Sequence, residues 1–298
     1  MRRYVNIAVA ALVSVCSASA CFAPQQNGAG AQDDKLLMDS HDFNSAQDAS
    51  VSTFASFNTK SSARTENSGL LEMPALTGDD TIIRHSGFVI SYNSEWYIPN
   101  WVAYELTREE LEGDEERGDR MFSMDPSYRK TQSMREDYRD SDWTKGHMAP
   151  AADFSWSSDA MDETFYLTNV CPQDETLNRN DWEYLERQVR SWARKYGKAW
   201  VVTGPIVSEN KYGTIGERGV VVPDSFFKAV LVQKSGKYRS IAFIMDNDAR
   251  RYWLNDCAIS VNELEDITGI DFFPALDDSI EDATEDQLRL SDWGINVR

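Results

Sequence analysis

The chain has 298 residues, of which 41% are hydrophobic and 11% aromatic, so it can bury the core of one domain with appendages. This composition excludes a disordered or fibrous protein. The formal net charge of −19 argues against a nucleic-acid partner, because neutralising phosphates usually needs a basic surface; a metal ion with a few arginines nevertheless needs only a local positive field.

The first twenty residues predict a secretory signal peptide. Arg2 and Arg3 begin the segment, a short apolar stretch follows, and an A-x-A cleavage site at residues 18–20 directly precedes Cys21. We therefore expect an exported protein that is secreted, periplasmic or attached to the outer surface. Lipidation of Cys21, which would tether the chain to a membrane, and simple secretion remain two open alternatives.

Residues 21–84 are rich in Ser, Asn, Gln, Asp and Thr and show no helical or strand period, which predicts a flexible, low-complexity linker. Residues 85–298 form the predicted folded domain, with two acidic runs at 105–119 and 277–286 interpreted as solvated surface and an acidic C-terminal tail. Cys171 and Cys257 belong to this domain. They either pair in a disulfide or remain two free buried thiols.

The first half of the predicted domain is dominated by strands. Residues 88–90 and 101–104 are typical of two strands, with Pro99 and Asn100 breaking the chain between them. A polar, irregular stretch follows the first acidic run, and residues 164–170 predict a further strand.

The clearest predicted helix follows. We expect Asn180 to cap it, with Glu183 completing a capping box, while apolar residues recur at helical spacing up to Gly197. Next come a strand at 199–203, a hairpin of residues 226–232 and 238–245, and a short helix between Ser260 and Gly269. Strands and helices do not alternate regularly, so the predicted fold class is α+β and not a doubly wound sheet.

Three histidines are candidates for a base that works near neutral pH. His41 lies in the predicted linker, and His85 lies at the edge of the first strand, where we expect a surface residue. His147 follows a glycine, which lets the backbone approach a bulky substrate. It is either catalytic or a hydrogen-bonded structural histidine.

The predicted helix offers a second group of polar side chains. Asn178 lies at its start, and Glu186 and Arg190 are four residues apart on one face. One interpretation is an exposed ion pair. The other is a metal site, because an amide oxygen together with a carboxylate acting through water suits Mg²⁺, which keeps most of its waters.

Several segments in order resemble the sugar-non-specific DNA/RNA endonucleases, the ββα-metal nucleases related to mitochondrial endonuclease G. Residues 145–154, KGHMAPAADF, resemble the family's signature around a Gly-His pair. Residues 169–173, Leu177-Asn178 with Trp182, Leu185-Glu186, residues 100–104 and residues 120–126 also match in order. The resemblance covers about residues 87–274 and implies a central antiparallel sheet flanked by helices.

The resemblance also implies roles for individual residues. His147 would deprotonate the attacking water, and Asn178 would bind Mg²⁺, or Mn²⁺, directly. Glu186 would hold a metal-bound water. Arg190 would neutralise the phosphate, and Arg120 matches an upstream arginine with a similar role.

Further family positions are less uniform. Lys145, Asn169 and Gln173 are candidates for contact with substrate, although a bracing role suits Asn169 better and is an alternative for Gln173. Asn180 competes with Asn178 as the metal ligand, but the four-residue step to Trp182 favours Asn178. The usual Asp-Arg before Gly-His is here Thr144-Lys145, which keeps a charge but loses a carboxylate and a guanidinium fork.

These observations predict a metal-dependent endonuclease that contacts the phosphate backbone of DNA and RNA and reads little sequence. One alternative is a catalytically weakened nuclease fold that binds nucleic acid or a partner protein without cutting. Another is a surface lipoprotein whose acidic runs bind cations or a host protein.

Overall fold

The computed structural model describes residues 70–296. The predicted signal peptide, Cys21, His41 and most of the predicted linker lie outside the described residues. Within the described range, no helix is both long and apolar enough to cross a membrane.

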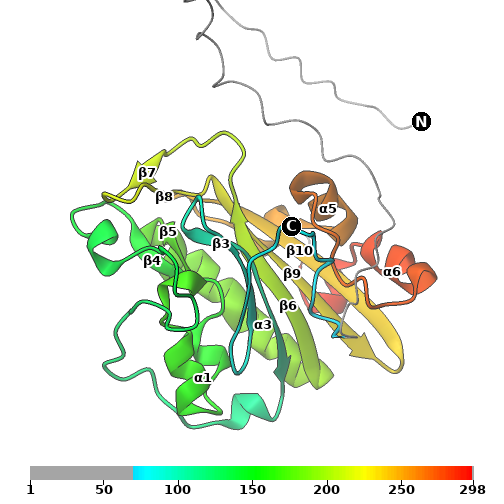
Figure 1. The fold of residues 1–298 in the computed structure, drawn as a ribbon. Helices are drawn as coiled ribbons and strands as arrows, with labels where there is room; N and C mark the ends of the chain where they lie inside the picture. The colour runs from blue at the N-terminus through cyan, green and yellow to red at the C-terminus, as the bar shows by residue number, and fades with distance from the viewer. Residues whose placement is uncertain (1–69, 297–298) are drawn as a thin grey trace, which may run out of the picture. The chain divides into compact units, whose positions relative to one another are not determined.

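A seven-stranded antiparallel sheet forms the centre of the fold, with the strand order β1-β2-β3-β6-β9-β10-β11 (Figure 1). Its strands are long where they are rich in Val, Ile and Phe and buried on both faces. They are β1 Ile82–Arg84, β2 Val89–Asn93, β3 Ile98–Thr107, β6 Lys198–Ile206, β9 Ser225–Lys234, β10 Lys237–Asp246 and β11 Ala258–Ile259.

Each face of the sheet carries its own core. On one face Val102, Val201 and Val230 pack with Leu185 and Val189 of helix α3, Glu183–Tyr196. On the other face the alternating residues of the same strands pack with helix α5, Val261–Thr268, and the chain that follows it. This layered arrangement confirms the predicted α+β class with a central antiparallel sheet flanked by helices.

A ββα unit lies beside the sheet. Strand β4, Thr144–His147, pairs with β5, Val170–Gln173, so that Thr144 is opposite Gln173 and His147 is opposite Val170. A continuous helical segment follows β5, made of α2 Glu175–Leu177, the π-helical turn η5 Asn178–Trp182, and α3. The strand expected at 164–170 is therefore wrong for most of its length, because residues 167–169 form the 3₁₀ turn η4.

The start of the main helical segment also differs from expectation. Asp174 caps it by accepting from the backbone N–H groups of Thr176 at 2.8 Å and Leu177 at 3.0 Å. Asn180 lies inside the π-helical turn, so the capping box predicted there does not form. The predicted end is confirmed, since Gly197 closes α3 in the left-handed region at φ 91°.

Several other expectations are confirmed. The hairpin β9–β10 turns at Ser235-Gly236, and Ser260 with Glu263 forms the predicted capping box of α5, which ends at Gly269. The remaining elements are η1 Glu110–Glu112, η2 Arg135–Tyr138, η3 Ala151–Asp153, α1 Ser158–Glu163, β7 Thr214–Ile215, β8 Val220–Val221, α4 Leu254–Cys257, α6 Asp278–Glu285 and η6 Leu290–Trp293.

Three expectations are corrected. Pro99 lies inside β3 and does not separate two strands. Ordered structure begins before His85, because β1 precedes it and Met73 is buried in the core. The acidic run at 277–286 is not a tail, since it forms α6, in which Glu285 is buried.

The cysteine alternatives are also resolved. Cys171 and Cys257 are both buried and free, so the two-thiol alternative describes the fold.

Candidate active site

A glycine lets strand β4 lie against the side chain of Gln173. A Cβ atom at Gly146 would lie 2.1 Å from Gln173 Oε1, so any larger residue would displace that side chain. The Gln173 amide is buried, and neither its nitrogen nor its oxygen has a hydrogen-bond partner among the described residues. The Gln173 side chain thus packs against the backbone of Gly146.

His147 occupies the last position of β4, in an aromatic setting. Its ring centroid lies 4.9 Å from that of Phe122 and 5.0 Å from that of Phe165. Its Nε2 atom has no partner within the described chain. Burial, aided by the positive charge of Arg117, lowers the pKa of His147 to about 3. The imidazole is therefore neutral at physiological pH, and its Nε2 atom is not held in a hydrogen bond within the described chain.

Asn169 holds the loop that follows His147. Its Nδ2 atom donates to the carbonyl oxygens of Ala149 and Thr164, each at 2.9 Å, and its Oδ1 accepts from the Ala149 N–H at 2.9 Å. The side chain is fully buried. This is the bracing alternative for Asn169, and it leaves no group for direct contact with substrate.

Thr144, at the other end of β4, fixes the candidate metal ligand. Asn178 Nδ2 donates to Thr144 Oγ1 at 3.1 Å, and Thr144 Oγ1 donates to the Gln173 carbonyl at 2.8 Å. The Asn178 amide is therefore oriented through its nitrogen, and its oxygen makes no hydrogen bond within the described chain. Asn180 instead turns its amide onto the Thr176 carbonyl at 2.7 Å and is exposed.

The π-helical turn affects which residues share a face with Asn178. Asn178 and Glu186 are eight positions apart in the sequence. In a regular α-helix a step of eight residues turns the side chain about 80° past two full turns, whereas a step of seven ends only about 20° short of two full turns. Because a π-helical turn holds one residue more than an α-helical turn, it brings Asn178 close to the face of Glu186.

Glu186 and Arg190 do not form the simple ion pair that their spacing allows. Arg190 Nη1 donates to Asp153 Oδ1 at 2.8 Å, and the Tyr104 hydroxyl donates to Asp153 Oδ2 at 2.8 Å. The Asp153 side chain is completely buried. Arg190 is thus held in place by a residue six positions after His147.

Lys228 of β9 completes this charged cluster. Its side chain is fully buried, its Nζ lies 4.8 Å from the Trp182 ring centroid, and it has no hydrogen-bond partner among residues 70–296. Burial lowers the pKa of Lys228 to about 8, against the attraction of Glu186. Burial likewise raises the pKa of Glu186 to about 7, while Lys228 opposes the shift.

Sequence reasoning missed Lys228 and Asp153. The signal for Lys228 was a single lysine inside the apolar run FFKAVLV at residues 226–232. A charged residue in such a strand needs a compensating charge nearby, and here the attraction of Glu186 opposes the loss of the Lys228 charge.

Lys145 projects over aromatic rings. Its Nζ lies 4.7 Å from the Tyr138 centroid and 5.9 Å from the Phe122 centroid. Burial, followed by the repulsion from Arg135, lowers the pKa of Lys145. The Phe122 ring also packs on the ring of His147. Lys145 and His147 therefore both lie against the side chain of Phe122.

Arg120 is engaged elsewhere. Its Nη2 donates to Glu115 Oε2 at 3.1 Å and to Ser158 Oγ at 2.9 Å, and its Nε pairs with Asp162. The exposed Arg117, by contrast, places its guanidinium 5.1 Å from the centroid of Phe165, whose ring contacts His147. Among the described contacts, Arg117 is the upstream arginine linked to His147.

His85 corrects the expectation of a surface residue. Its side chain is only 1% exposed, and its Nε2 lies 3.0 Å from Asp125 Oδ2. Asp125 also accepts from the Thr168 hydroxyl at 2.6 Å. His85 is therefore a buried structural histidine, and of the two histidines that the structure describes, His147 is the one whose Nε2 has no partner.

A comparison of the sequence with models of known protein families finds a match. The model of the DNA/RNA non-specific endonucleases matches residues 66–279. The chain belongs to this family. The match includes every candidate site residue described above.

Similar proteins agree with this assignment. The chain is 34% identical over 209 residues to the human protein named Nuclease EXOG, mitochondrial, covering 65% of this chain and 57% of that protein. It is 33% identical to human Endonuclease G, mitochondrial, over 69% of this chain and 73% of that protein. Nuclease C1 of Cunninghamella echinulata is 36% identical, over 67% and 85% of the two chains.

A solved structure shows the same fold. A chain in the crystal structure of the EndoG/EndoGI complex superposes with a TM-score of 0.65 and 28% sequence identity, over 73% of this chain and 96% of that one. The chain spans about three fifths of the length of its EXOG relatives, at 60%, 57% and 60% of the mouse, human and zebrafish proteins.

Proposed function

We propose that this protein is a metal-dependent endonuclease that hydrolyses phosphodiester bonds of DNA and RNA with little sequence specificity. The observation that carries the proposal is the arrangement on β4. A neutral histidine with an unpartnered ring nitrogen ends the strand, and the residue that orients the Asn178 amide begins it. A base and a metal ligand positioned by one short strand fit in-line attack of water on a phosphate.

The residues fit a lightly coordinated cation. Among residues 70–296, no group of three or more His, Cys, Asp or Glu side chains is placed to hold a metal ion. The site we propose therefore uses the Asn178 amide oxygen, with Glu186 binding through water. Such a donor set suits Mg²⁺, with Mn²⁺ as the alternative. When bound, the ion would polarise the phosphoryl oxygens and help the leaving oxygen.

The protein's own groups supply the remaining steps. His147 takes the proton of the attacking water at its free ring nitrogen. Arg190, held by Asp153, lies where it can offset charge on the phosphate, and Lys145 offers a further cation. We give the upstream arginine's role to Arg117, with Arg120 as the alternative. Contacts of this kind go to the phosphate backbone, which is why both DNA and RNA would be substrates.

A binding protein without activity is the second candidate function. The family's Asp-Arg is replaced by Thr144-Lys145, and the net charge of −19 disfavours tight binding of nucleic acid. In the structure, however, Thr144 still anchors Asn178 through its hydroxyl. This contact favours the enzyme.

We also propose that residues 1–20 direct export, although relatives at this similarity are named as mitochondrial proteins. Production of the full chain in a bacterium, followed by N-terminal sequencing of the mature protein, tests this proposal. A mature chain that starts at Cys21 supports export, and labelling with palmitate would then distinguish a lipid tether from secretion. A chain that keeps residues 1–20 would contradict it.

The decisive test of activity is plasmid cleavage by the full chain with Mg²⁺, with EDTA and as the His147→Ala variant. We expect cleavage to need the metal and to fall by about 10² to 10⁴-fold without the imidazole, while binding of nucleic acid is retained. A well-folded protein that cuts with none of several divalent metals would establish the binding protein instead.

A further inference from the structure

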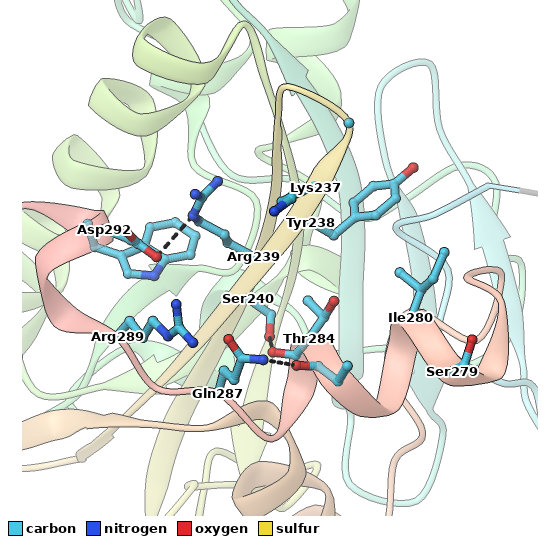
Figure 2. A pocket seen from close by; sticks show the side chains of 13 residues that line it. Lys237, Tyr238, Arg239, Ser240, Ser279, Ile280, Thr284, Gln287, Arg289 and Asp292 are labelled. Atoms are coloured by element: carbon cyan, nitrogen blue, oxygen red, sulfur yellow. Dashed lines mark hydrogen bonds and ion pairs between the residues drawn. The ribbon is translucent and has the colours of Figure 1, made fainter.

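A cavity of about 460 Å³ lies between β10, α6 and η6, within the size range of ligand pockets in proteins. Figure 2 shows its side chains, with Arg239 and Arg289 on one side and Ile280 and Thr284 of α6 on the other. Neither the motif residues around His147 nor the Glu186 cluster line this cavity. It is a separate feature of the fold.

The charged side chains that line the cavity are mostly cationic. Lys237, Arg239 and Arg289 are positive, and Asp292 is the one carboxylate that lines it. This leaves an excess of two positive charges in a chain whose formal net charge is −19. Acidic residues outnumber basic residues in the whole chain, so a cavity lined mainly by cations differs from the rest of the protein.

Two of the three cations have no internal partner. Within the described chain, neither the Lys237 ammonium nor the Arg289 guanidinium forms a hydrogen bond or ion pair. Arg239 donates from Nε to Asp292 Oδ2 at 2.9 Å, yet its Nη1 atom is buried without a hydrogen-bond partner (Figure 2). Burying a donor without a partner is unfavourable, and more so when the donor is charged. A negative charge beside this guanidinium would offset its unpaired positive charge.

The acidic helix α6 keeps its carboxylates out of the cavity. Its lining residues are Ser279, Ile280, Ala283 and Thr284, which recur at helical spacing on one face. The carboxylates at positions 278, 281, 282 and 285 fall on the remaining surface of the helix and do not line the cavity. The second acidic run of the sequence is therefore arranged so that an anion could bind beside it.

From these observations we infer that the cavity is a binding site for a phosphate monoester of mononucleotide size. A phosphate monoester carries a charge of about −2 at neutral pH, which balances the excess of two cations. Arginine's planar fork binds phosphate oxygens in pairs. Ile280, Ala283 and Trp293 provide an apolar wall for the rest of the ligand.

The cavity also contacts the helix that carries the candidate active site. The carbonyl oxygen of Asp292 accepts from Lys195 Nζ at 2.9 Å and from the Tyr196 hydroxyl, and the Trp192 indole N–H donates to the Trp293 carbonyl at 2.9 Å. A ligand bound between β10 and η6 would therefore stabilise the C-terminal end of α3. The inference itself does not depend on nuclease activity.

Isothermal titration of the full chain in EDTA tests the site. The titrants are inorganic phosphate, adenosine 5′-monophosphate and adenosine. We expect saturable binding of the phosphate-bearing titrants and none of adenosine. Tighter binding of the monophosphate than of inorganic phosphate would show use of the apolar wall, and equal binding would show that the phosphate group alone is held. Absence of saturable binding by both would overturn the inference.

Variants locate the binding. Arg289 is exposed and unpaired within the described chain, so Arg289→Gln should fold normally and weaken binding by about 10-fold or more. The control is Arg139→Gln, whose side chain is 69% exposed and outside the cavity. Asn178→Ala should retain binding. If binding survives in Arg289→Gln and is lost in Asn178→Ala, the phosphate is bound at the candidate active site and the inference is wrong.

Discussion

The Asn178 side-chain nitrogen donates to the hydroxyl oxygen of Thr144 at 3.1 Å, across the junction between strand β4 and the π-helical turn. Thr144 is a position at which this chain departs from the usual family residue. The hydroxyl also donates to the Gln173 carbonyl, so its direction is fixed by two contacts. Thr144 thus acts as a positioning residue for the proposed metal ligand.

Replacing Thr144 should therefore affect metal affinity more than chemistry. We expect Thr144→Val to weaken the apparent affinity for Mg²⁺ by about 10 to 100-fold, with kcat largely recovered at saturating metal. Thr144→Ser keeps the hydroxyl and should restore the affinity. Titration of cleavage rate against Mg²⁺ measures both. Equal metal affinity in Thr144→Val and Thr144→Ser would show that the Thr144 hydroxyl does not position Asn178.

The candidate site residues were chosen because short ordered segments resemble the endonuclease family. His147, Asn178, Glu186 and Arg190 belong to short ordered motifs, and the structure places Asn178 and His147 on or against β4 and Glu186 beside Arg190 on α3. The strands with strong β-propensity and the ends of α3 and α5 at glycines were likewise readable, because their causes are local.

Tertiary contacts decided the rest. The Asn180–Glu183 pattern matches a capping box, but the helical segment already begins after Asp174, which caps it. Asn180 therefore lies inside the segment and not at its N-terminus. Lys228 and Glu186 are forty-two positions apart in the sequence, and no local rule pairs them. The sequence predicts His85 at an exposed strand edge, but its side chain is buried and contacts Asp125, which is 40 positions away in the sequence.

The upstream arginine can be assigned by a pair of substitutions. Arg117 is exposed and contributes to the low pKa of His147, so Arg117→Ala should raise that pKa and lower kcat/KM by about 10-fold. Arg120→Ala removes contacts to Glu115 and Asp162 and should mainly reduce stability. Kinetics and an NMR titration of His147 separate the two. A folded Arg120→Ala protein with a comparable loss of activity would assign the role to Arg120.

We expect any side chain at position 146 to destabilise the fold unless the residue at position 173 is made smaller. In Gly146→Ala the new methyl would meet Gln173 Oε1 at 2.1 Å, and we expect a loss of about 1–3 kcal/mol in the free energy of unfolding. The double variant Gly146→Ala/Gln173→Ser should recover part of this loss. Urea unfolding measures all four proteins of the cycle. Additive effects of the two substitutions would show that their contact is not the cause.

The stability of the fold should fall with rising pH because of a buried carboxyl on α6. Burial, with the negative charges of Glu265 and Glu281, raises the pKa of Glu285 from its ordinary value of about 4.5 to about 10. Between these two values the folded protein holds a proton that the unfolded chain releases. The contribution is therefore complete below about pH 4.5 and is lost as pH rises towards the folded pKa, by at most about 1.4 kcal/mol per pH unit.

Glu285→Gln keeps the neutral shape at every pH and should flatten this dependence. We expect the variant to be more stable than the natural chain at pH 8, by about 1–2 kcal/mol, and the difference to shrink towards pH 5. The exposed Glu217→Gln substitution, which lies outside α6, also removes one negative charge and serves as the control. Urea midpoints at pH 5, 6.5 and 8 measure the effect. Parallel pH profiles for the natural chain and Glu285→Gln would place the source of any pH dependence outside α6.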